Sequence, residues 1–212
     1  MVSFYGFAYP TRMAIARLAD GGLWVWSPVA LDEAGHAEVR ALGEVRDIVA
    51  PNRLHHLFLD AWAARWPQAR LHAAPGLIRK RPDLTFATEL GDLADPAWGG
   101  EIDQVVFRGS FAMEEVVFCH RPSRTALFCD LIQRHDGASQ SGWRGLLMRL
   151  DGLVGPHGST PREWRASLLR RGAARAARAR VLAWHAQRLL IAHGDCARTG
   201  ATPIIAAALA WL

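Results

Sequence analysis

The chain has 212 residues, of which 50% are hydrophobic, with 25 basic and 20 acidic side chains and three cysteines. This length suits a single domain, 1–212, and the composition excludes a disordered chain or a disulfide-stapled scaffold. The longest apolar segment, residues 203–212, is about half as long as a membrane-spanning helix. Residues 1–10 lack the pattern of a secretory signal. We therefore expect a cytoplasmic protein without a membrane partner.

The first half of the chain predicts strands joined by tight turns and two helices. Asp20-Gly21-Gly22 predicts a hairpin turn, and Gly43 predicts the end of a helix. A strand, a helix and a second strand then follow, which favours parallel pairing with a right-handed crossover. We expect strands at 13–19, 23–26, 45–50 and 69–73, and helices at 31–42 and 57–66.

The second half predicts closely spaced strands, then helices, then one late strand. Strands covered by helices on the outside are the expected layers. Cys119 and Cys129 alternate with core positions, which predicts buried thiols. We expect strands at 102–107, 115–119, 124–129 and 188–192, and helices at 142–150, 161–169, 173–187 and 202–212.

Two adjacent histidines, His55 and His56, end the motif PNRLHH (51–56), which directly follows the expected strand 45–50. Loops at the carboxyl ends of strands are where open α/β sheets usually build their sites. In a regular helix the two rings would point about 100° apart, but in a loop both can face one ion. Imidazole suits zinc and iron. The alternative is a pair of hydrogen-bonded histidines at the start of a helix.

Two further polar residues, Asp130 and His193, each follow an apolar run. A buried carboxylate needs a metal ion, an arginine or a helix N-terminus as its partner, although an ordinary turn aspartate is the alternative. Together with His55 and His56 they provide four nitrogen and oxygen ligands. That is the number which one closed or nearly closed metal site needs.

The order of these motifs resembles the metallo-β-lactamase fold superfamily. Its first motif reads HxHxDH, and residues 51–56 of this chain, which read PNRLHH, stand in that place. The family's later strand-ending ligand matches Asp130, and its closing His-Gly motif matches His193-Gly194. The resemblance covers nearly the whole chain and implies an α/β fold, the four-layer αββα sandwich.

The departures from the family pattern are grouped at one metal site. Pro51, Arg53 and Ser110 stand where the ligands of one of the family's two sites would be. The resemblance therefore implies one divalent metal ion, zinc first, with iron or manganese as alternatives. The four residues that it implies as ligands are His55, His56, Asp130 and His193.

The resemblance also implies a metal-dependent hydrolase for a small ester, lactone, thioester or similar anionic substrate. Water on the metal would be the nucleophile, and Asp130, as the catalytic residue, would orient it. Arg53 is a candidate for binding a substrate carboxylate or phosphate, but it could instead lie on the surface or pair with Asp60 or Asp130. His72 and His157 are further candidates for the substrate-binding rim.

Other functions and other basic or ionisable residues stay open. A non-catalytic metal-binding protein of the same fold would explain the loss of a whole site. Nucleic-acid binding is less favoured, because the arginines of residues 161–180 lack interleaved aromatic residues, apart from Trp164, to stack on bases. Residues 79–81 predict an anion-binding cluster or a solvated turn, and His135 is expected at the surface or in a turn. A homodimer is also left open.

Overall fold

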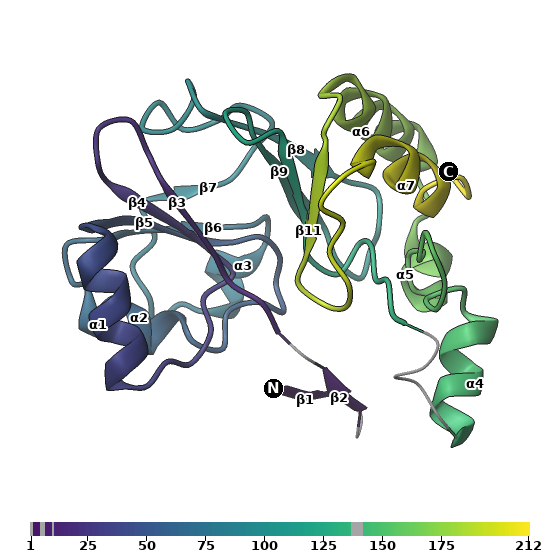
Figure 1. The fold of residues 1–212 in the computed structure, drawn as a ribbon, viewed down its shortest axis with the longest axis horizontal. Helices are drawn as coiled ribbons and strands as arrows, with labels where there is room; N and C mark the ends of the chain where they lie inside the picture. Colours follow the sequence, from purple (N-terminus) through teal and green to yellow (C-terminus); the bar gives the residue numbers. More distant parts are fainter. Residues whose placement is uncertain (1, 5–6, 10, 137–141) are drawn as a thin grey trace.

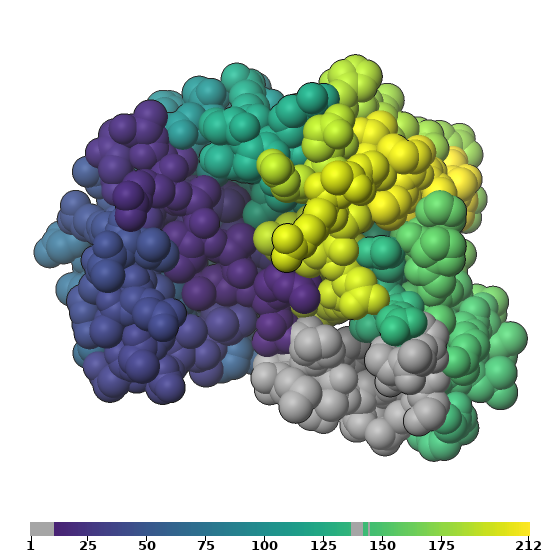
Figure 2. Space-filling model, in the orientation of Figure 1, coloured from purple at the N-terminus to yellow at the C-terminus, as the bar shows by residue number. Residues whose placement is uncertain are grey.

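The computed structural model describes residues 2–4, 7–9, 11–136 and 142–212, and its two main sheets lie between outer helices (Figure 1). The N-terminal segments fill one side of the molecule and the C-terminal segments the other (Figure 2). This arrangement confirms the expected mixed α/β sandwich. Among the described helices, none is long and apolar enough to cross a membrane.

The first main sheet has the order β3-β4-β5-β6-β7. Its first two strands form the predicted antiparallel hairpin, and the later neighbours pair in parallel, as the strand–helix–strand pattern predicts. The strands are β3 (Ala14–Arg17), β4 (Leu23–Trp26), β5 (Val45–Ala50), β6 (Arg70–Ala73) and β7 (Thr88–Glu89).

The second main sheet has the order β11-β10-β9-β8. Its late strand returns parallel to β10, whereas the other pairs are antiparallel. The carboxyl ends of β10 and β11 therefore lie at the same edge of the sheet. The strands are β8 (Ile102–Phe107), β9 (Glu115–His120), β10 (Thr125–Phe128) and β11 (Arg188–Ile191).

Seven helices and a small N-terminal hairpin complete the described elements. Asp32 caps the first helix, because its side chain accepts a hydrogen bond from the backbone N–H of Gly35. The helices are α1 (Glu33–Leu42), α2 (Leu59–Arg65), α3 (Leu77–Lys80), α4 (Gly142–Leu150), α5 (Arg162–Ser167), α6 (Arg171–Ala183) and α7 (Ala201–Ala208). The hairpin pairs β1 (Val2–Phe4) with β2 (Phe7–Tyr9).

Three buried apolar layers hold these elements together. The middle layer lies between the two sheets. It contains Trp24 and Phe118, whose rings pack edge to face with their centroids 5.2 Å apart. One outer layer packs α1 and α2 on the first sheet, and the other packs α5, α6 and α7 on the second. Helix, sheet, sheet and helix therefore follow one another, which confirms the four-layer αββα sandwich.

The sequence did not predict the shortest elements. The hairpin β1–β2, the one-turn helix α3 and the two-residue strand β7 are too short to show a hydrophobic period. The helix expected at 173–187 instead begins at Arg171 and ends at Ala183. His185, two residues later, has a φ of +49°, which no helix tolerates in its interior.

Candidate metal centre

Four polar side chains each follow the carboxyl end of a strand and meet at one place between the sheets. Ser27 follows β4, His55 follows the turn after β5, Asp130 follows β10 and His193 follows β11. The two histidine Nε2 atoms are 3.0 Å apart. The carboxylate lies 3.1 Å from Nε2 of His193 and 3.4 Å from Nε2 of His55. Both sheets thus contribute to one mostly buried cluster.

These separations fit a single metal ion. Ligand atoms bonded at about 2.0–2.1 Å in a tetrahedral arrangement are about 3.3 Å apart, which is close to the distances among His55, Asp130 and His193. Two imidazoles and a carboxylate also suit zinc, iron or manganese. An ion held by these three side chains would keep a coordination position for water or substrate, whereas a closed structural zinc site has four protein ligands.

Cys129 also lies near this cluster. Its Sγ and the ligand atoms of His55 and Asp130 all lie within 4.8 Å of one another. Complete burial raises the pKa of the thiol well above its usual value, and the nearby carboxyl of Asp130 adds to the effect. Cys129 is therefore a buried thiol beside the cluster, with its sulfur within reach of the same place. Cys119 is buried too, and both burial predictions are confirmed.

The ring of His55 is oriented by a hydroxyl. Ser27 Oγ lies 2.7 Å from Nδ1 of this histidine, which leaves Nε2 facing Asp130 and His193. A partner of this kind on the far nitrogen fixes the tautomer and the ring orientation of a ligating histidine.

Asn52 connects the two loops that carry His55 and Asp130. Its amide nitrogen donates to Asp130 Oδ2 at 2.7 Å and to Glu115 Oε2 at 3.1 Å. Its amide oxygen accepts from the backbone N–H groups of Leu54 and His55. The side chain is fully buried, so these hydrogen bonds satisfy the amide and hold the turn after β5 against the end of β10.

Glu115 supports the other side of Asp130. It lies at the start of β9, fully buried, and accepts hydrogen bonds from the backbone N–H groups of residues 129–131. Burial and the neighbouring Asp130 raise the pKa of Glu115 to about 7. Burial alone would also raise the pKa of Asp130, but interactions with His55 and His193 lower it overall. Asp130 is therefore the carboxylate that stays ionised.

His56 was expected in the ligand set, and the structure places it outside. Its Nδ1 lies 3.2 Å from a guanidinium nitrogen of Arg81, because neighbouring side chains of the turn point in different directions. Burial and the charges of Lys80 and Arg81 lower the pKa of His56. The converging set in the described residues is therefore His55, Asp130 and His193.

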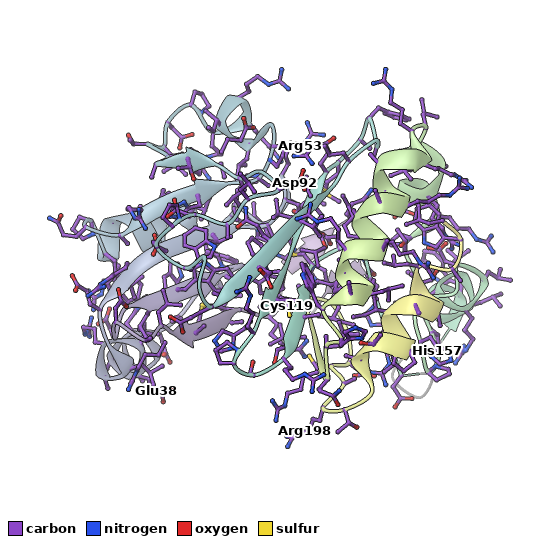
Figure 3. The ribbon with its side chains drawn as sticks, turned by 90° about the horizontal axis from the view of Figure 1, so that it is seen from above. Glu38, Arg53, Asp92, Cys119, His157 and Arg198 are labelled. Atoms are coloured by element: carbon purple, nitrogen blue, oxygen red, sulfur yellow. The ribbon has the colours of Figure 1, made fainter. Side chains whose placement is uncertain are left out.

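His72 and His157 do not line the same rim. His72 is fully buried, with Nε2 at 2.8 Å from Asp47 and Nδ1 at 3.0 Å from Thr88, because its strand turns this side chain into the core. His157 is exposed in a loop, far from Arg53 in the view of Figure 3. Neither expectation matches the geometry.

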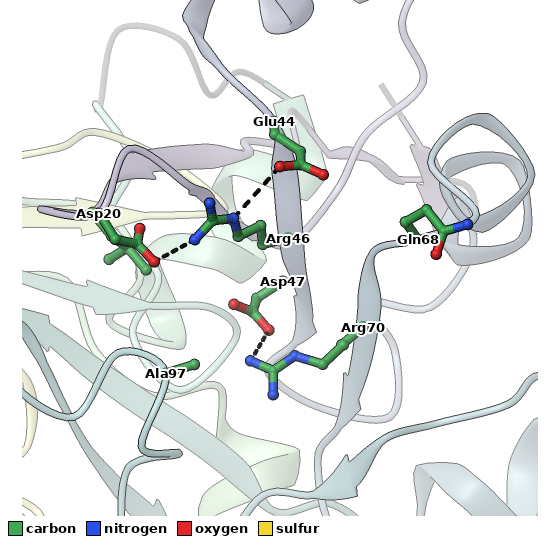
Figure 4. A pocket seen from close by; sticks show the side chains of 8 residues that line it. Asp20, Glu44, Arg46, Asp47, Gln68, Arg70 and Ala97 are labelled. Atoms are coloured by element: carbon green, nitrogen blue, oxygen red, sulfur yellow. Dashed lines mark hydrogen bonds and ion pairs between the residues drawn. The ribbon is translucent and has the colours of Figure 1, made fainter.

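A smaller pocket of about 320 Å³ lies near the amino end of β5, beside Asp47. Its basic side chains already have acidic partners: Arg70 binds Asp47, and Arg46 binds Asp20 and approaches Glu44 (Figure 4). Internal ion pairs therefore line this pocket, and the candidate metal centre lies at the opposite ends of the strands.

The candidate metal centre opens into a cavity of about 1260 Å³. Arg53 lines it and donates to the backbone carbonyl of Ala112. Neither Asp60 nor Asp130 lies within ion-pairing distance of Arg53 in the part of the chain that the structure describes. The cavity also takes in Arg79 and Lys80 of the expected basic cluster.

Sequence reasoning missed the residues that support the ligands. Asn52 lies inside the motif 51–56, but an amide there suggested no role, and Glu115 resembled an ordinary strand start. His135 was expected in a turn or at the surface, yet it is 5% exposed. Burial and His193 lower its pKa. Only long-range contacts identify these residues.

The fold defines the class to which this chain belongs. It has the metallo-β-lactamase fold, as similar solved structures show. A metallo-beta-lactamase from Pontibacter korlensis is 11% identical with a TM-score of 0.63, over 99% of this chain and 90% of that one. The metallo-beta-lactamase FIM-1 from Pseudomonas aeruginosa, in its mono-zinc form, is 12% identical with a TM-score of 0.55, over 92% and 88%. The Flv1 flavodiiron core from Synechocystis sp. PCC6803, metal soaked, is 15% identical with a TM-score of 0.61, over 93% and 51%.

Within this fold, the chain belongs to the family described as a domain of unknown function (DUF4336), whose model matches residues 2–137. No curated protein matches the chain by sequence. The match includes His55 and Asp130, whereas His193 lies beyond it. At these low identities the solved structures establish the fold alone.

Proposed function

We propose that this protein is a metal-dependent hydrolase with a single metal site. The observation that carries the proposal is the convergence of His55, Asp130 and His193 at the wall of the large cavity. A bound divalent ion, zinc, iron or manganese, would supply Lewis acidity and an activated water for hydrolysis. The mono-zinc and flavodiiron relatives support a metal at this fold and keep zinc and iron as candidates.

Each residue of the candidate metal centre would have its own role in hydrolysis. His55 and His193 would hold the ion as neutral imidazoles, and Asp130 would hold it as an ionised carboxylate. As an acceptor beside the open position, Asp130 would also orient the attacking water. Arg53 would attract the anionic part of the substrate, because its guanidinium faces the cavity without a carboxylate partner in the described residues. The substrate would be an ester, lactone, thioester or similar anionic molecule.

Metal analysis and a substrate panel test the proposal. We expect about one zinc, iron or manganese ion per chain by mass spectrometry, and turnover of at least one ester, lactone, thioester or phosphodiester. Asp130→Asn and His193→Ala should lose both metal and turnover. His185→Asn is the matched control, because it removes an exposed histidine and asparagine tolerates the left-handed backbone there.

The outcomes separate the proposal from its alternatives. One ion per chain without turnover on the whole panel would favour a non-catalytic metal-binding protein of the same fold. A protein that takes up no metal on reconstitution would contradict both. Salt-dependent retention of DNA or RNA, with no hydrolysis of small substrates, would favour nucleic-acid binding.

A further inference from the structure

Helix α4 carries an exposed apolar stripe, and part of this helix lines the cavity. Trp143, Leu146, Leu147 and Leu150 are spaced i, i+3, i+4 and i+7, and each is 49–64% exposed. Met148 of the same helix is buried, and it lines the cavity together with Leu147 and Leu150. Because Leu147 and Leu150 line the cavity, the stripe continues into the space that holds the candidate metal centre.

A second apolar wall belongs to the turn after β5. Leu54 and Leu57 are 38% and 56% exposed, and both line the same cavity. They lie on either side of His55 in the sequence. Apolar surface therefore borders the candidate metal centre both from α4 and from the loop that carries one of its ligands. Exposed apolar residues gathered around one cavity are typical of a ligand-binding site.

A group of cations lies on the same loop and the adjoining α3. Lys80 Nζ donates to the backbone carbonyl of Arg53 at 2.7 Å. A side-chain carbon at Gly76 would lie 3.3 Å from Arg53 Cδ and 3.7 Å from a guanidinium nitrogen of Arg53 and of Arg79, so both guanidinium groups lie beside this glycine. Among the described residues, no carboxylate lies within ion-pairing distance of Arg53, Arg79 or Lys80. Burial and the charges of Arg53 and Arg81 lower the pKa of Lys80, as expected for a cation group that lacks an anion.

The size of the cavity limits the choice of ligand. A volume of about 1260 Å³ exceeds the range of about 300–1000 Å³ that is usual for small-molecule sites. A small polar ester would leave the apolar walls in contact with water. A ligand with an apolar chain and an anionic group would cover both walls and neutralise the cations.

We propose that the substrate is a single-chain amphiphile: an acyl ester, thioester or lactone with a long apolar chain and an anionic group. This inference rests on the proposed hydrolase function. The chain would lie along Leu147 and Leu150 of α4, and the anionic group would bind Arg53, Arg79 and Lys80. Hydrolysis breaks the bond between the acyl carbon and the leaving oxygen or sulfur. Water gives its hydroxyl to the acyl carbon and its proton to the leaving group.

A chain-length series tests the apolar wall. The substrates are 4-nitrophenyl and 3-carboxy-4-nitrophenyl esters of straight-chain acids with two to twelve carbons, below their micelle concentrations. We expect kcat/KM to rise about 4-fold per methylene until the wall is covered, and the carboxylated series to exceed the neutral one. The double variant L147S/L150S should flatten the rise. Leu93→Ser, an exposed leucine outside the cavity lining, is the control.

Binding measured without turnover separates this inference from the proposed function. By calorimetry, dodecyl phosphate should bind at least 100-fold more tightly than inorganic phosphate. The double variant R79A/K80A should weaken dodecyl phosphate about 10-fold or more, whereas Arg198→Ala, far from Arg53 in Figure 3, should not. Tight dodecyl phosphate binding without any ester turnover would overturn the hydrolase and support the amphiphile as the ligand.

Three other results would overturn the inference. Turnover whose kcat/KM does not depend on chain length would leave the hydrolase in place and remove the amphiphile. Binding to vesicles of anionic lipid, with no saturable binding of dodecyl phosphate, would assign the stripe to a membrane surface. Dimerisation that is abolished by L147S/L150S, again without dodecyl phosphate binding, would assign it to a second copy of the chain.

Discussion

At the scale of single residues, the side-chain amide of Asn52 holds two candidate ligands, His55 and Asp130, in position. Asn52 donates to Asp130 and accepts from the backbone of His55, so a shift of either loop would break its hydrogen bonds. Groups of this kind orient metal ligands without touching the metal. A buried carboxamide is also costly to leave unpaired, which favours the one arrangement that satisfies it.

Removing this amide should weaken metal binding. Asn52→Ala should lower the affinity for zinc about 10–100-fold, measured by competition with a chromogenic chelator, while the circular dichroism spectrum stays that of a folded protein. Gln187→Ala removes an exposed carboxamide and is the control. An unchanged affinity in Asn52→Ala would show that Asp130 and His55 hold their positions independently.

Glu115 makes the stability of the metal-free protein depend on pH. Its pKa is about 7 in the folded chain, against an ordinary value of 4.5. Between these values the native state binds more protons than the unfolded state, so the free energy of unfolding falls as pH rises through this window. The loss is on the order of 3 kcal/mol and is complete above pH 7. The lowered pKa of Asp130 acts only at more acidic pH.

Urea unfolding of the chelator-treated protein at pH 5 and pH 8 measures this effect. The lowered pKa values of His56 and His135 act in the opposite direction over this range, so the comparison is made with Glu115→Gln. The stability of the wild type relative to this variant should fall from pH 5 to pH 8, because glutamine does not titrate. The same pH dependence in both proteins would assign the proton to another group.

At the scale of elements, the turn after β11 is shaped by a very close backbone approach. Gly194 has a φ of +117°, and a side-chain carbon there would lie 1.9 Å from the carbonyl oxygen of Arg134. Arg12 also donates to the carbonyl of Gly194 at 3.0 Å. The glycine of the His-Gly motif therefore sets the path of the chain that presents His193.

Two glycine substitutions separate backbone strain from this collision. Gly200→Ala should cost about 1 kcal/mol, because its φ is +67° and its surroundings are open. Gly194→Ala should cost on the order of 3 kcal/mol and also weaken metal binding through His193. Urea denaturation and the chelator competition measure the two effects. Equal costs at both positions would mean that the loop relaxes around the methyl group.

The arginines of α6 make contacts within the chain. Arg178 donates to the carbonyl of Ala206, and Arg175 to that of Leu212. Arg180 pairs with Asp92 at 3.1 Å. These three arginines therefore connect α6 to neighbouring segments of the chain.

The sequence predicted elements and strand ends better than side-chain directions. Apolar runs followed by Asp130 or His193, and a strand followed by the motif that ends in His55 and His56, are local patterns. The order of the strands brings these ends together. Whether His56 turns toward the cluster depends on the dihedral angles of one turn. Hydrophobic periodicity in the sequence does not predict these angles. The role of Glu115 depends on residues 129–131, which become its neighbours only through strand pairing.

At the scale of the whole molecule, the candidate metal centre joins the two sheets. His55 comes from the first sheet, whereas Asp130 and His193 come from the second. An ion held by all three would bind the folded chain and not the unfolded one, so it would stabilise the sandwich as a unit.

Metal removal should therefore lower the melting temperature. At a metal concentration 100 times the dissociation constant the stabilisation is about 2.7 kcal/mol, which corresponds to roughly 5–10 °C for a chain of this length. Calorimetry with and without a chelator should show this shift in the wild type and in His185→Asn, and no shift in His193→Ala. A chelator effect that persists in His193→Ala would place the ion elsewhere.

The sequence separation of the two histidines also suggests that the metal site forms late in folding. His55 and His193 are 138 residues apart, and such long-range contacts form late because closing the intervening chain is entropically costly. The first sheet and the β8–β9–β10 meander are built from local pairings that need nothing beyond residue 128. A refolding chain should regain most of its β-structure before β11 docks parallel to β10, and metal uptake would mark that final step.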